Sequence, residues 1–136
     1  MRVVLDTNIL VSALISPGGH PAAIYDAWAH SRFTLLTCAE HLEELRATLQ
    51  KPRIADLIKP YKAGRLVNQI RKLAENVGHL PRVKRSPDPN DDFLLALSEA
   101  GMADYLVTGD RAGLLALRRH FATQIVSASD FAAQLA

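Results

Sequence analysis

The sequence lacks the features that mark membrane-spanning, secreted or disulfide-bonded proteins. Its longest apolar run, 9–15, is interrupted by Ser12 and is far shorter than the roughly 20 residues that cross a bilayer. The N-terminus has no charged region, apolar stretch and small-residue cleavage site of a signal peptide. Cys38 is the only cysteine, so no internal disulfide can form. We therefore expect a cytoplasmic protein that does not associate with membranes.

Sequence patterns that define several enzyme classes are also missing. There is no GxGxxG, no Walker loop and no Ser-His-Asp arrangement, which leaves acyl transfer and kinase chemistry without support. Zinc is not expected, because there is one cysteine and the five histidines show no ligand spacing. No repeat or linker divides the 136 residues, so we expect one domain, 1–136.

Positive charge is concentrated in the middle of the chain. Residues 51–85 contain ten basic and two acidic residues, a net charge of +8, although the whole chain carries only +2. The remainder therefore holds six basic and twelve acidic residues. This asymmetry could place a polyanion beside a group of carboxylates, although a solvated helical face would have the same composition.

Strands alternate with helices along the chain. We predict strands at 2–5, 33–36, weakly at 77–80, at 105–107 and at 124–126. We predict helices from a cap at Thr7 or Asn8 to a point before Ser16, at 21–30, from a Thr37–Glu40 capping box to Lys51, at 54–58, at 61–75, from a cap at Asp88, at 112–119, and from a cap at Ser129. This order predicts an α/β protein with a parallel sheet covered by helices on both faces.

Carboxylates follow two of the predicted strands. Asp6 ends the first strand and Asp110 comes three residues after the strand at 105–107. Ligands of such sheets bind beyond the carboxyl ends of the strands, at the point where the strand order reverses. Two further acidic pairs, Glu43–Glu44 and Asp91–Asp92, lie on predicted helices. Each acid singly could be a cap, a first-turn anion or a solvated residue.

Together the acids favour a metal site. Buried carboxylates without partners are unfavourable, and clustering them raises the pKa of some. No basic residue lies close in sequence to Asp6 after Arg2, nor within the apolar helix after Asp92. Mg²⁺ or Mn²⁺, which prefer oxygen ligands, would relieve the repulsion. Such metals serve phosphodiester hydrolysis by activating water and neutralising charge on the phosphate.

Four segments resemble the PIN domain family, close to its bacterial toxin components of toxin–antitoxin systems. They are VVLDTNILVSAL, HLEELRATLQKPRI, DPNDDFLLALSEAGMADYLVTGD and LLAL. The resemblance covers nearly the whole chain and is weakest at 55–85. It implies a three-layer α/β/α sandwich with a central parallel sheet of about 4–5 strands, and Mg²⁺- or Mn²⁺-dependent cleavage of single-stranded RNA. It also implies a possible antitoxin partner and homodimer.

The resemblance assigns roles to particular residues. Asp6, Glu44, Asp92 and Asp110 match the family's catalytic metal ligands, with Asp6 and Asp92 expected to bind directly. Asn8, Ser12, Thr108 and Asp91 fall where auxiliary polar groups lie. Arg85 and Arg111 are candidate contacts to the RNA backbone. Glu43 and Glu44 flank the leucine stripe of their helix on opposite sides, so periodicity does not choose between them, and Asp91 adjoins Asp92 and could exchange roles with it.

Two other classes of protein remain as alternatives. A haloacid-dehalogenase-like phosphatase also begins with an aspartate after its first strand, but it needs a second acid two residues later, where this chain has Asn8. A receiver-like domain would need paired acids at the first strand. A non-catalytic RNA-binding PIN-like module would retain RNA binding after chelation of metal, which separates it from a nuclease.

Overall fold

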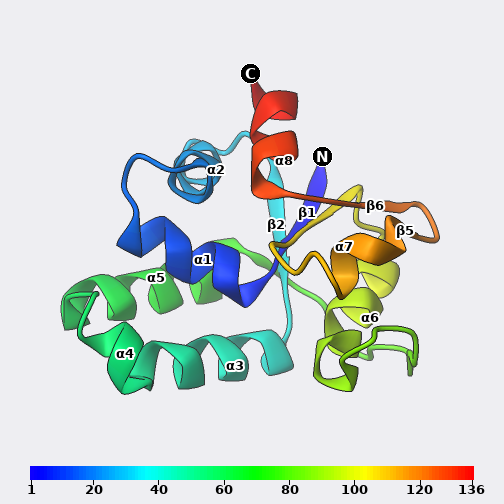
Figure 1. The fold of residues 1–136 in the computed structure, drawn as a ribbon, viewed down its shortest axis with the longest axis horizontal. Helices are drawn as coiled ribbons and strands as arrows, with labels where there is room; N and C mark the ends of the chain where they lie inside the picture. The colour runs from blue at the N-terminus through cyan, green and yellow to red at the C-terminus, as the bar shows by residue number, and fades with distance from the viewer.

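Six strands form one central sheet in the computed structural model, which describes all residues 1–136 (Figure 1). In chain order, the elements are β1 (Arg2–Leu5), α1 (Thr7–Ile15), α2 (His20–Ala29), β2 (Thr34–Thr37), α3 (Ala39–Gln50), α4 (Pro52–Ala55), α5 (Pro60–Leu73), β3 (Glu75–Asn76), the 3-10 helix η1 (Pro89–Asp91), α6 (Asp92–Ala100), β4 (Tyr105–Val107), α7 (Leu114–Leu117), β5 (Arg119–His120), β6 (Thr123–Val126) and α8 (Ala128–Leu135). No helix is long and apolar enough to span a bilayer.

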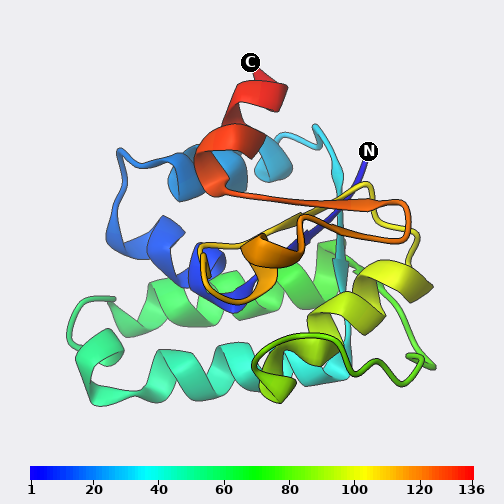
Figure 2. The ribbon, with the colours of Figure 1, turned by 45° about the vertical axis from the view of Figure 1, so that its right-hand side comes forward.

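Helices cover both faces of the sheet, which confirms the predicted three-layer α/β architecture. Side chains of β1 alternate between the faces: Val3 and Leu5 join the core beneath α1, α2, α3, α5 and α8, whereas Val4 joins the core beneath α6 and α7. Figures 1 and 2 show α6 and α7 on the side of the sheet opposite to α1 and α2. Because both faces are covered, the strands are apolar without alternation.

The strand order is β3-β2-β1-β4-β6-β5. All neighbouring strands are parallel except β5 and β6. From β1 the chain builds the sheet first toward β2 and β3, and then returns to add β4 on the other side of β1. The order therefore reverses between β1 and β4, and this is where the architecture places its ligand site.

The structure differs from the predicted strands at two short edge elements. The weak strand expected at 77–80 is instead the two-residue β3, Glu75–Asn76. The two-residue β5 was not predicted, and it makes the sheet six-stranded instead of four- or five-stranded. It pairs antiparallel with β6 through a turn in which Phe121 has φ 50°, a left-handed conformation that sequence rules assign to glycine or asparagine.

Three predicted helix caps are wrong and one is confirmed. Helix α1 begins at Thr7 itself, α3 is preceded by Cys38 without a capping side chain, and α8 is capped by Ser127, whose Oγ accepts from the N–H of Asp130 at 3.2 Å. Asp88 does cap the turn before α6, because its Oδ1 accepts from the N–H of Asn90 at 3.0 Å.

Candidate metal-binding site

The candidate site lies at the carboxyl ends of β1 and β4, the central strand pair. The N–H of Asp6 donates to the carbonyl of Val107 at 2.9 Å, which continues the ladder one residue past β1. The N–H of Thr108 donates to the carbonyl of Val126 at 3.0 Å and continues the next ladder in the same way. Backbone pairing therefore fixes Asp6 and Thr108 side by side at the point where the strand order reverses.

Asp6 is the most deeply buried acid of the site, with 6% of its surface exposed. It occupies the backbone position that precedes α1, but its side chain makes no capping hydrogen bond. Its Oδ2 instead accepts from Oγ1 of Thr108 at 2.7 Å. Burial raises the pKa of Asp6, and Glu44 raises it further, while the Thr108 hydrogen bond and the N–H groups of Asn8 and Thr7 oppose the rise.

Thr108 connects Asp6 to Asp110. Thr108 is fully buried, and the same Oγ1 that donates to Asp6 accepts from the N–H of Asp110 at 3.2 Å. Oδ1 of Asp110 accepts from the N–H of Gly113 at 3.0 Å, which closes a tight turn before α7. The hydroxyl of Thr108 is thus a donor toward one acid and an acceptor from the backbone of the other.

The structure distinguishes Asp91 from Asp92. Oδ1 of Asp92 accepts from the N–H groups of Arg85 at 3.0 Å and Ser86 at 2.7 Å, so Asp92 secures the preceding loop. Asp91 instead faces the other acids: its pKa rises to about 6 through burial and then through Asp6, Asp88, Asp110 and Glu44. The structure therefore brings Asp91 together with the other acids, whereas Asp92 holds the loop that precedes it.

Glu44 and Glu43 are also distinguished. Glu44 is half-buried and its charge raises the pKa of both Asp6 and Asp91. Glu43 is exposed and contributes to neither. Glu44, and not Glu43, is therefore close enough to Asp6 and Asp91 to influence their charges. Asp6, Glu44, Asp91 and Asp110 are called the acidic cluster below; they come from four separate segments of the chain.

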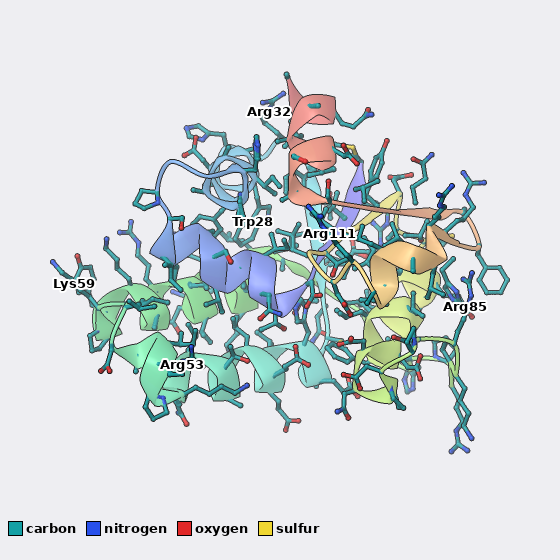
Figure 3. The ribbon with its side chains drawn as sticks, in the orientation of Figure 1. Trp28, Arg32, Arg53, Lys59, Arg85 and Arg111 are labelled. Atoms are coloured by element: carbon teal, nitrogen blue, oxygen red, sulfur yellow. The ribbon has the colours of Figure 1, made fainter.

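The remaining predicted residues differ in how they are associated with the acidic cluster. Thr108 bonds to it directly, as described. Asn8 is exposed on the first turn of α1, and Ser12 is half-buried one turn further along. Arg111 is exposed, none of the ion pairs involves it, and it lies near the middle of Figure 3 on the loop between β4 and α7. Arg85 lies at the right of the same view, and its guanidinium binds β5.

The donor set of the acidic cluster suits a hard divalent cation. All four side chains offer carboxylate oxygens, and no basic residue is among the groups that shift the pKa of Asp6 or Asp91. Their mutual repulsion is therefore uncompensated within the chain, and a cation would relieve it. No three His, Cys, Asp or Glu side chains stand close enough, in their present positions, to hold one ion. Direct ligation would require the side chains to turn inward or to act through water.

Helix α3 carries a second buried titratable group, His41, one turn before Glu44. His41 is 3% exposed, its Nε2 has no hydrogen-bond partner, and its ring packs against Phe93 of α6 with centroids 5.9 Å apart. Burial lowers its pKa to about 4. His41 and Phe93 thus form an apolar contact between the helix of Glu44 and the helix that follows Asp91.

We expect His41 to make folding sensitive to acid. The unfolded chain binds a proton near the ordinary pKa of 6.5 and the folded chain only near 4, so stability falls as pH drops through this window, by about 3 kcal/mol. His41→Leu removes this loss. Urea denaturation of both proteins at pH 7 and pH 4.5 measures this effect. Between the two pH values, the free energy of unfolding should fall more for the wild type than for His41→Leu. Identical pH dependence of the two proteins would contradict the burial of a neutral imidazole.

Comparison with family models identifies the fold family. The model described as PIN domain matches residues 2–112, which include the whole acidic cluster. The chain therefore belongs to the PIN domain family, whose members share a nuclease-type fold and are commonly nucleases. None of the curated protein sequences compared with the chain matches it.

Proposed function

We propose that this protein is a metal-dependent endoribonuclease that hydrolyses phosphodiester bonds in single-stranded RNA. The observation that carries the proposal is the acidic cluster: four carboxylates from four segments lie near the point where the strand order reverses, and burial and mutual repulsion raise the pKa of Asp6 and Asp91. Clustered, uncompensated carboxylates in this position suit cation binding better than structural stabilisation. Membership of the PIN domain family supports the nuclease class.

Mg²⁺ or Mn²⁺ is the proposed cofactor, held by Asp6, Asp91 and Asp110 with Glu44 completing the site. When bound, the metal would supply Lewis acidity toward a phosphate oxygen and a water that ionises near neutral pH. Thr108 orients the carboxylate of Asp6 through its 2.7 Å hydrogen bond. The same hydroxyl receives the N–H of Asp110 and so fixes the spacing between two of the acids. Asn8, exposed, and Ser12, half-buried, supply polar groups on α1 after Asp6.

RNA is the proposed substrate because basic side chains available to a polyanion are exposed on the same molecule. Arg53 and Lys59 lie at the left of Figure 3, on and after α4, and Arg111 lies near its middle. Arg111, exposed on the loop that carries Asp110, is the nearest candidate in sequence for a phosphate contact. Such contacts bind the backbone without regard to sequence and weaken with salt. The proposal extends to a cytoplasmic toxin with an antitoxin partner, and to a homodimer.

The function is tested by incubating 5′-labelled single-stranded RNA with the purified protein and Mg²⁺, Mn²⁺ or EDTA. We expect internal cleavage with either metal and none with EDTA. At limiting metal the rate should rise with pH, because a proton on Asp91, whose pKa is about 6 without metal, competes with the cation. Single-stranded DNA and p-nitrophenyl phosphate are the control substrates. RNA binding that persists in EDTA without any cleavage would favour the binding module, and hydrolysis of p-nitrophenyl phosphate alone would favour the phosphatase.

A further inference from the structure

His120 is buried between two charged side chains, although no sequence motif singles it out. It is 5% exposed, and its Nε2 lies 2.9 Å from Oε1 of Glu99 on α6. Its Nδ1 lies 2.9 Å from Nη1 of Arg85. A guanidinium can only donate, so Nδ1 must accept. The ring proton is therefore on Nε2 and is donated to Glu99, which makes His120 neutral and fixes its tautomer.

Arg85 extends this connection to the start of α6. Its Nη1 also donates to the carbonyl of Arg119 at 2.6 Å, so the guanidinium is held by both residues of β5. Its backbone N–H, together with that of Ser86, donates to Oδ1 of Asp92. Asp92 is the first residue of α6 and directly follows Asp91 of the acidic cluster. A continuous series of hydrogen bonds therefore runs from Glu99 through His120 and Arg85 to Asp92.

The segment before α6 has few other restraints. Residues 78–87 belong to no helix or strand, and none of them donates or accepts a backbone–backbone hydrogen bond. Leu80 and Val83 pack against the core beneath α6. The only hydrogen bonds that hold the segment are those of Arg85 and Ser86 described above. The position of the chain entering η1 and α6 therefore depends on the hydrogen bonds of Arg85.

We propose that His120 is a positioning residue for the acidic cluster, acting through Arg85. By presenting Nδ1 as an acceptor, His120 locks the guanidinium against β5. The locked Arg85 presents two successive N–H groups to Asp92, which sets the first turn of α6 and with it the direction of Asp91. Glu99 contributes by holding the proton of His120 on Nε2. Arg85 is by this account a structural support of the site and not a contact to RNA.

Two substitutions of His120 separate its two hydrogen bonds. In His120→Asn the side-chain oxygen can take the place of Nδ1, so the bond from Arg85 is kept and that to Glu99 is lost. In His120→Phe both are lost, while a ring remains to pack against Phe121, whose centroid lies 4.9 Å from that of His120. Supporting residues of metal ligands typically change metal affinity or activity about 10–100-fold.

We expect His120→Phe to lower Mn²⁺ affinity and kcat by about 10–100-fold with the KM for RNA little changed, and His120→Asn to stay within about threefold of the wild type. Arg85→Gln, on an exposed side chain that can be replaced without burying a charge, should reproduce the Phe effect. Mn²⁺ affinity is measured by electron paramagnetic resonance titration, and cleavage by single-turnover kinetics. Equal losses in the Asn and Phe variants, or a change of KM alone in Arg85→Gln, would overturn the proposal.

The kinetic part of this inference rests on the proposed nuclease function, so one measurement is independent of it. Hydrogen exchange of the Arg85 and Ser86 amides in the metal-free protein reports whether Asp92 still accepts from them. Both amides should exchange at least about tenfold faster in His120→Phe than in the wild type, and at the wild-type rate in His120→Asn. Unchanged exchange in the Phe variant would refute the connection even if the wild type cleaved RNA. Inactivity of the wild type with the expected exchange pattern would refute only the nuclease.

Discussion

Replacing Asp91 with asparagine is expected to abolish metal-dependent cleavage and, at the same time, to stabilise the metal-free protein. Asp91 is the acid on which the other charges of the cluster converge, since Asp6, Asp110 and Glu44 all raise its pKa. Loss of a ligand of the proposed metal site would remove several kcal/mol of charge stabilisation, which corresponds to a fall in rate of about 10³-fold or more. Single-turnover cleavage of single-stranded RNA with Mn²⁺ measures this loss.

The gain in stability follows from the raised pKa of Asp91, which moves from 3.8 to about 6. The folded protein disfavours the charged form, so the penalty is absent below pH 3.8 and complete above pH 6. The shift corresponds to about 3 kcal/mol, which we reduce to about 1–2 kcal/mol because water screens the partly exposed carboxylate. Urea denaturation in EDTA should therefore show Asp91→Asn more stable than the wild type at pH 8 and equal to it near pH 3.5.

The adjacent substitution Asp92→Asn is the matched control. The asparagine oxygen can still accept from the N–H groups of Arg85 and Ser86, so the loop and the start of α6 should persist. We expect cleavage within about tenfold of the wild type, because a neutral acceptor replaces a charged one. An inactive Asp92→Asn beside an active Asp91→Asn would support Asp92 as the ligand, as the resemblance implies, and contradict the role proposed for Asp91.

The different surroundings of Asp91 and Asp92 illustrate what sequence patterns cannot determine. Successive residues of a helix differ in direction by about 100°, so the first residue of α6 decides which acid faces the cluster. That start is set by the 3-10 turn at Pro89–Asp91 and by hydrogen bonds from Arg85 and Ser86. Periodicity within 93–97 carries no information on it, because this helix is apolar on every side.

The location of the candidate site was predictable because it depends only on strands and their ends. Residues 2–5 and 105–107 have the unalternating apolar sequence of buried parallel strands, and the structure places both strands as predicted. The acids that follow them must then meet at one sheet edge. Glu43 and Glu44, by contrast, flank the buried stripe of α3 on opposite sides. The choice between them depends on how α3 lies against the rest of the molecule.

Capping and burial of single polar residues were the least predictable features. Thr37 fits a capping box by sequence, yet it remains the last residue of β2, with its Oγ1 buried and without a partner. His120 has no local signal at all. Its burial depends on the β5–β6 hairpin, and its partners Glu99 and Arg85 lie 21 and 35 residues away in sequence. Such positions are decided by tertiary contacts that local propensity does not contain.

Replacing Asp6 with asparagine is expected to abolish cleavage and also to lower the pKa of Asp91. Asparagine is nearly isosteric and its oxygen can still accept from Oγ1 of Thr108, so the contact between the ends of β1 and β4 should persist. The buried charge at this position is lost, and with it a ligand of the proposed metal site. We therefore expect loss of RNA cleavage comparable to that of Asp91→Asn, in a protein whose fold is preserved.

The effect on Asp91 tests the acidic cluster without reference to any activity. After burial, Asp6 is the largest cause of the raised pKa of Asp91, so neutralising it should move that pKa from about 6 toward the ordinary value. Carboxyl ¹³C chemical shifts followed against pH in the metal-free protein measure the change. Glu43→Gln removes a charge from the exposed neighbour of Glu44 and should leave the titration of Asp91 unaltered. If Asp91 titrated alike in Asp6→Asn and the wild type, the two carboxylates would not share a site, whatever the protein cleaves.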